Sequence, residues 1–264
     1  MHQNRTILIL ALILMLGWGN HVTAEQSPLD LGIAALKRGD HETAAQMFRI
    51  EAEAGSAYGQ YNLGVMYDNG FGVPQSDAEA VRWYRMAAEQ GDATAQLKLG
   101  VMYDGGFGVP QDYAEAARWY RMAAEQGDAK AQFNLGVMYA DGEGVPRNDA
   151  EAVRWFRMAA EQGDAGAQFN LGLMYRTGKG VPRNDAEAVR WYRMAAEQGH
   201  AGAQNNLGVM YRNSFGVTKN LVKAYMWTSL AAAQGNETAR HNLEIDERQM
   251  TRAQIAEAQR LAAA

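Results

Sequence analysis

The sequence predicts an all-α fold, an α/α superhelical solenoid of antiparallel helix pairs. One observation is an internal repeat: the motif Leu-Gly-Val-Met-Tyr, once with leucine in third place, returns every 36 residues. A second is that each repeat has two apolar stretches at helical spacing, separated by a glycine-rich turn. Because one such pair cannot bury its apolar stripe alone, neighbouring pairs must stack. The five copies of the motif begin at Leu63, Leu99, Leu135, Leu171 and Leu207.

Residues 1–24 have the pattern of a secretory signal peptide. Arg5 precedes an unbroken apolar run of ten residues, Ile7–Leu16, and small residues stand at the exit, Val22-Thr23-Ala24. This run is shorter than the roughly 20 residues that span a bilayer, so we expect cleavage after Ala24 rather than an uncleaved anchor. The mature chain is then exported, periplasmic or secreted, and has no membrane insertion.

Residues 25–56 are expected to form a shorter helix pair that begins the solenoid. The segment Leu31–Gly55 carries two apolar stretches, and a tight turn at Gly39-Asp40 replaces the long glycine-rich turn of the later units. A solenoid needs such a modified unit at its end, where one face must meet water.

Residues 57–236 divide into five repeats, each beginning with a helix. In the second repeat Ala95, Leu99 and Met102 fall at i, i+4 and i+7, which is one face of a helix. The turn Gly105–Gln111 then ends this helix, because it holds three glycines and a proline. The five repeats span residues 57–92, 93–128, 129–164, 165–200 and 201–236.

The second helix of each repeat begins at a polar cap. Ser76, followed three residues later by Glu79, has the spacing of a reciprocal capping box. We expect Arg85 to pair with Glu89 on the solvent side and Gly91 to end the helix. The buried stripe is expected to comprise Ala80, Trp83, Tyr84, Ala87 and Ala88.

Residues 237–264 are expected to close the solenoid with a half-repeat around Leu243 and a capping helix. Thr251 and Gln254 have the spacing that caps this last helix, and its alanine-rich sequence suits a lid packed on one side.

The repeat resembles the Sel-1-like repeat, a relative of the tetratricopeptide repeat. The resemblance covers Ala57–Asn236, and residues 25–56 resemble an ordinary tetratricopeptide unit. It implies an α/α superhelix that acts as a protein-interaction scaffold, found in exported bacterial proteins. A cysteine-rich exported subgroup is linked to β-lactam or peptidoglycan binding, and this chain has no cysteine. In the second repeat the resemblance is carried by Leu99, Gly100, Tyr103, Gly106, Gly108, Val109, Ala116, Trp119, Ala123, Ala124 and Gly127.

Composition argues against several classes of function. The net charge of −5 disfavours nucleic acid as a partner, and the absence of cysteine excludes disulfides and a thiol nucleophile. The histidines beyond the signal region, His41, His200 and His241, show no metal-ligand spacing and are interpreted as surface residues. No catalytic residue, metal or cofactor is predicted.

Candidate partner-binding residues lie where the five copies differ, in the turn between the two helices of each repeat. A ring that sister repeats replace by glutamate or lysine is not needed for folding, so it is a candidate contact. Loop drift, or packing of the ring against its own repeat, is the alternative. The candidates are Asp68, Phe71, Asp104, Phe107, Asp141, Glu143, Arg176, Lys179, Arg212 and Phe215.

These observations predict a non-catalytic, monomeric scaffold of the cell envelope or exterior. It would bind a protein or extended peptide on its concave face and inter-helix turns. The alternatives are a hydrolase or binder of β-lactams or peptidoglycan, and a secreted effector that contacts a host protein.

Overall fold

The computed structural model describes residues 27–263, and all the regular elements in that range are α-helices. The predicted signal peptide lies outside the described residues. The helices are α2 (Pro28–Lys37), α3 (His41–Glu53), α4 (Ala57–Asn69), α5 (Asp77–Glu89), α6 (Ala93–Gly105), α7 (Tyr113–Glu125), α8 (Ala129–Asp141), α9 (Asp149–Glu161), α10 (Ala165–Thr177), α11 (Asp185–Glu197), α12 (Ala201–Asn213), α13 (Leu221–Ala233), α14 (Glu237–Glu247) and α15 (Arg252–Ala262).

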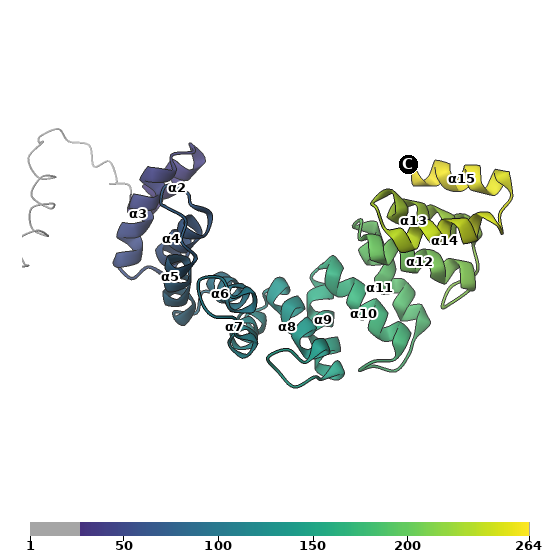
Figure 1. Cartoon of the computed structure of the whole chain (residues 1–264), viewed down its shortest axis with the longest axis horizontal. Helices are drawn as coiled ribbons and strands as arrows, with labels where there is room; N and C mark the ends of the chain where they lie inside the picture. Colours follow the sequence, from purple (N-terminus) through teal and green to yellow (C-terminus); the bar gives the residue numbers. More distant parts are fainter. Residues whose placement is uncertain (1–26, 264) are drawn as a thin grey trace, which may run out of the picture.

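Helices that are adjacent in sequence pack as pairs, and the pairs follow one another along an arc (Figure 1). The two ends of the arc, α2 and α15, both lie at the top of this view. This arrangement confirms the predicted α/α solenoid.

The second helix of each repeat supplies most of the core. Ala80, Tyr84, Ala87 and Ala88 are fully buried and Trp83 is nearly so, which confirms the predicted stripe. The equivalent tryptophan of the next repeat belongs to the same buried cluster, so each repeat completes the core of the one before it.

The glycine in the Leu-Gly motif permits close packing between the two helices of a repeat. A Cβ atom at Gly100 in α6 would lie 2.6 Å from the ring of Tyr120 in α7. The glycine therefore makes room for the tyrosine ring, which is 1% exposed.

One buried glutamine near the start of each repeat joins it to the unit before. The amide of Gln96 donates to the carbonyl of Ala88 in the preceding repeat at 3.1 Å, and its oxygen accepts from Gln126 at 2.7 Å. Gln132 and Gln162 repeat the second contact at 2.8 Å. Because both polar atoms of Gln96 are satisfied, its side chain can be buried, and its bond to Ala88 fixes the register between the two repeats.

The arginines of the second helix make different contacts from those predicted. Arg85 donates to the hydroxyl of Tyr103 in the next repeat at 2.6 Å instead of pairing with Glu89. Arg82 pairs with Glu79 at 3.2 Å. A reciprocal capping box at Ser76 would need the Glu79 carboxylate, which this ion pair engages. Only one of the two bonds of the box is present, in which the Ser76 side chain accepts from the backbone amide of Glu79.

Both end helices begin at a capping side chain, and the cap of the last helix was predicted from the sequence. Ser27 accepts from the backbone amide of Asp30 at the start of α2. Thr251 and Gln254 form a complete reciprocal capping box at the start of α15.

His200 caps α12 with a neutral ring nitrogen. Its Nδ1 accepts from the amide of Ala203 at 3.2 Å, at a position where earlier repeats have Asp92, Asp128 and Asp164. Burial lowers the pKa of His200 below its ordinary value of 6.5. As the pH falls through this range, the unfolded chain takes up the proton first, so the free energy of unfolding decreases.

We therefore predict that His200→Asp reduces this loss on acidification. An aspartate stays charged and keeps accepting from the helix amides, so between pH 7.5 and 5 the variant should lose less of its free energy of unfolding than the wild type. Urea unfolding at both pH values measures the difference. Equal losses of stability in the wild type and the variant would show that protonation of His200 does not cause the loss on acidification.

Candidate functional site

The turns between the two helices of each repeat pack against the repeat before. At Gly108 a Cβ atom would lie 2.4 Å from the backbone carbon of Asp77, the first residue of α5. Gly144 approaches the carbonyl of Tyr113 in α7 in the same way, and both glycines have φ of 68°. The turns therefore form a row along the solenoid, and each turn packs against the repeat before it.

The three phenylalanines of these turns are partly exposed and partly packed. Phe71, Phe107 and Phe215 are 43%, 50% and 39% exposed. The ring of Phe71 stacks on His41 with centroids 4.9 Å apart, while the ring of Phe107 lies over Gly105, where a Cβ atom would be 2.1 Å away. The rings of Phe71 and Phe107 are thus held in place while part of each meets solvent.

The two aspartates at the starts of the first two turns hold buried tyrosines. The hydroxyl of Tyr84 donates to Asp68 at 3.0 Å, and that of Tyr120 donates to Asp104 at 3.3 Å. Lys98 from the following repeat approaches Asp68 at 3.5 Å. Burial, with the nearby carboxylate, raises the pKa of both tyrosines. These aspartates therefore have a structural role within the junction between repeats.

Arg212 was predicted to face a partner, and the structure places it inside the protein. Its side chain is 9% exposed and pairs with the fully buried carboxylate of Asp246 at 3.2 Å. It also donates to the side chain of Asn242 at 3.0 Å. Arg212 therefore fastens α14 to the last repeat, because a buried guanidinium requires partners for its donors.

Asp141 and Arg176 are also not part of one row of equivalent, exposed charges along the turns. Asp141 does not occupy the repeat position of Asp104, since Ala140 stands 36 residues after that aspartate. Arg176 is half-buried beside Tyr192. Among the charged candidates Asp141, Glu143 and Lys179 are exposed, whereas Arg176 is only partly accessible.

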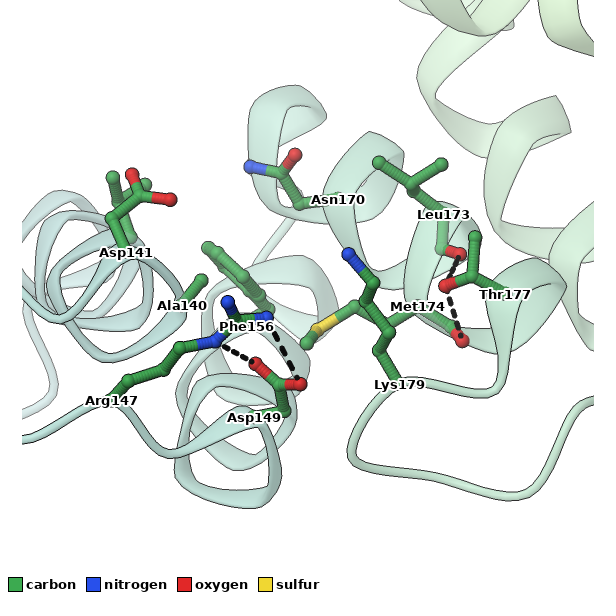
Figure 2. A pocket seen from close by; sticks show the side chains of 11 residues that line it. Ala140, Asp141, Arg147, Asp149, Phe156, Asn170, Leu173, Met174, Thr177 and Lys179 are labelled. Atoms are coloured by element: carbon green, nitrogen blue, oxygen red, sulfur yellow. Dashed lines mark hydrogen bonds and ion pairs between the residues drawn. The ribbon is translucent and has the colours of Figure 1, made fainter.

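A pocket of about 500 Å³ opens between the third and fourth repeats (Figure 2). Helices α8, α9 and α10 and the turn that follows α10 form its walls, and it brings the predicted residues Asp141 and Lys179 to one site. Its volume lies within the range of sites that bind small ligands or single side chains.

Two substitutions explain why the pocket opens at this junction. Ala140 replaces the aspartate found at Asp68 and Asp104, and Phe156 replaces the tyrosine that donates to it in the first two repeats. The third repeat therefore lacks both the carboxylate and the hydroxyl that occupy this position in the first two repeats. The change leaves an apolar floor at Phe156 and Ala140.

The rim of the pocket is polar and charged. Arg147 and Asp149 form a two-point ion pair, with donor–acceptor distances of 3.2 and 3.4 Å. Figure 2 shows the ammonium of Lys179 pointing inward and Asp141 at the opposite side. Within residues 27–263 neither Lys179 nor Asp141 forms an ion pair.

The described residues form no group of three or more histidines and acids able to hold a metal. No described helix is long and apolar enough to span a membrane. The polar groups of the pocket can bind a charged ligand, and they include no nucleophile paired with a general base.

Comparison with known proteins identifies the repeat. The Sel1 repeat profile matches residues 57–92, 93–128, 129–164, 165–200 and 201–236. The chain belongs to the Sel1 repeat family. Sel1 repeat proteins are typically non-catalytic scaffolds for protein interactions. Among curated proteins no sequence matches this Sel1 repeat protein.

The solved structures that share this fold include two that are more than 30% identical to the chain. One is a protective antigen of uropathogenic Escherichia coli strains that displays an SLR fold, 39% identical with a TM-score of 0.81. The match covers 88% of this chain and 51% of the antigen, so the chain spans about half the antigen's length. The other is a Sel1 repeat protein from Oxalobacter formigenes, 34% identical with a TM-score of 0.74, covering 83% of this chain and 96% of that one.

Proposed function

We propose that this Sel1 repeat protein is a non-catalytic scaffold that binds a protein or extended peptide on its concave face and inter-helix turns. The observation that carries the proposal is the pocket between the third and fourth repeats, which is built from positions that vary among repeats. The buried positions scarcely vary, so differences between repeats are free to serve recognition. A rigid groove loses little entropy on binding, which supports affinity without a reactive group.

We further propose that the scaffold acts outside the cytoplasm. The pattern of residues 1–24, with one early positive charge, a short apolar run and small residues at the exit, supports export and cleavage after Ala24. The mature chain would then comprise the helix pair within residues 25–56, the five repeats and the closing helices of residues 237–264.

Affinity capture from a cell-envelope extract tests the scaffold and the exposed turns. The variant Phe71→Glu plus Phe107→Lys places at these turns the residue types that Glu143 and Lys179 supply in sister repeats, so it should fold. We expect it to retain less than about one tenth of the captured partner, as loss of a central aromatic contact predicts.

Arg118→Gln is the matched control, because Arg118 is exposed and, among residues 27–263, forms an ion pair only with Glu115 on the same helix. This variant should capture as much as the wild type. Equal capture by all three proteins would contradict a role for the turn phenylalanines. Hydrolysis of a chromogenic β-lactam by the purified protein would contradict the scaffold itself.

A further inference from the structure

We propose that the pocket between the third and fourth repeats binds one acidic side chain of a partner peptide, with apolar residues beside that side chain packing on the pocket floor. The inference rests on the proposed scaffold function and names the chemistry that one of its sites recognises. The partner's carboxylate would take the place of the carboxylate that the chain itself supplies in the first two repeats.

The first junction shows how the fold accommodates a carboxylate at this place. Asp68 accepts from the hydroxyl of Tyr84 at 3.0 Å and lies 3.5 Å from the ammonium of Lys98 in the following repeat. At the junction of the third and fourth repeats Ala140 and Phe156 replace the carboxylate and the hydroxyl, and Asn170 stands at the position of Lys98. The space is therefore shaped for a carboxylate that the chain no longer provides.

Lys179 supplies a cation for an incoming carboxylate. Sister repeats have phenylalanine or glutamate at this position, so the lysine is particular to the fourth repeat. Figure 2 shows its ammonium directed into the pocket. Arg147 is already engaged by Asp149, at 3.2 Å, whereas Lys179 has no ion-pair partner among the described residues. A ligand carboxylate would therefore find one unpaired ammonium.

Asn170 supplies a hydrogen-bond donor beside this cation. At the preceding junction the equivalent Asn134 interacts with the hydroxyl of Tyr120. Phe156 has no hydroxyl, and Asn170 makes no side-chain hydrogen bond within residues 27–263. Its amide lines the pocket and is available to a ligand oxygen (Figure 2).

The remaining walls select for apolar neighbours and against a second acid. Val137, Leu173 and Met174 line the pocket, and Leu173 is 39% exposed. Covering these side chains with apolar groups of a ligand removes apolar surface from water and favours binding. Asp141 at the opposite side repels further carboxylates, so a peptide with a single acid is favoured over a polyacidic one (Figure 2).

Fluorescence anisotropy with labelled, carboxamide-terminated peptides tests the proposal on the full mature chain. The probes carry one glutamate flanked by leucine, valine or phenylalanine, and matched probes carry glutamine instead. We expect the glutamate probes to bind at least tenfold more tightly than the glutamine probes. Lys179→Glu should abolish this preference, and lysine-centred probes should bind that variant better than the wild type.

The double variant Ala140→Asp plus Phe156→Tyr restores the residues of the first two repeats and should fill the pocket. We expect it to fold as the wild type does and to bind glutamate probes at least tenfold more weakly. Asp104→Ala plus Tyr120→Phe makes the opposite change in the second repeat and is the control, with binding of the probes unchanged.

Equal affinity for glutamate and glutamine probes, undiminished binding by the Ala140→Asp plus Phe156→Tyr variant, or no binding of any probe would overturn the proposal. Preference for probes with a free carboxyl terminus and no glutamate would also overturn it, since the carboxylate would then come from the chain end. The scaffold function survives these outcomes if partner capture still depends on the turn phenylalanines.

Discussion

Gly144→Ala should lower the free energy of unfolding by about 3–5 kcal/mol, one of the two largest effects we expect from a single substitution. The residue has φ of 68°, and its Cβ atom would lie 2.0 Å from the carbonyl oxygen of Tyr113. The turn must therefore move away from α7, which breaks the contact between the second and third repeats. Urea unfolding followed by circular dichroism measures the loss.

Gly163→Ala is the control for this clash, because it measures the cost of a positive φ in alanine without a steric clash. Gly163 also has positive φ, 99°, but no atom lies within 4 Å of its added Cβ. The expected loss is about 1–2 kcal/mol. Equal losses in the two variants would show that the turn of the third repeat does not clamp the repeat before it.

Asp246→Ala should destabilise the C-terminal end by about 3–5 kcal/mol, because it leaves a buried guanidinium without its counter-ion. Arg212 and Asp246 are 3.2 Å apart, with 9% and 0% of their side chains exposed. Hydrogen exchange should show the loss first in α12 to α14, because Arg212 joins these elements.

The surface pair of Arg190 and Glu187 provides the control. These residues are also 3.2 Å apart, but their side chains are 59% and 35% exposed. Glu187→Ala should change stability by less than about 1 kcal/mol. The double change Arg212→Met plus Asp246→Leu should recover much of the loss of Asp246→Ala, and failure to do so would show that packing rather than the unpaired charge causes it.

Local patterns were sufficient to predict the helices. The period of 36, the stripe through Trp83 and Tyr84 and the capping residues Thr251 and Gln254 depend on neighbours within a few turns of the chain. Such short-range signals specify helix faces and ends directly. The fold followed from stacking those faces.

Contacts between repeats were predicted less well. The bond from Arg85 to Tyr103 joins residues 18 apart, and the bond from Arg212 to Asp246 joins residues 34 apart. No helix-face pattern reveals such partners, since these contacts depend on how two neighbouring units pack against each other.

The pocket had a signal in the sequence that could have been found. Aligning the copies shows that aspartate and tyrosine of the first two repeats change together, to Ala140 and Phe156, in the third. Loss of a hydrogen-bonding pair within one unit predicts an opening between helices. The turn candidates Asp141 and Lys179 meet there, whereas Asp68, Asp104 and Arg212 serve the structure.

The central claim, that binding resides in the positions that differ among repeats, is tested most directly by exchanging whole repeats. Replacing residues 129–200 with two copies of residues 93–128 keeps the period and the buried stripes and removes the pocket. We expect the melting temperature to stay within about 4 °C of the wild type, which corresponds to roughly 1 kcal/mol. Binding of the glutamate probes should be lost. Full binding by this folded variant would contradict the claim.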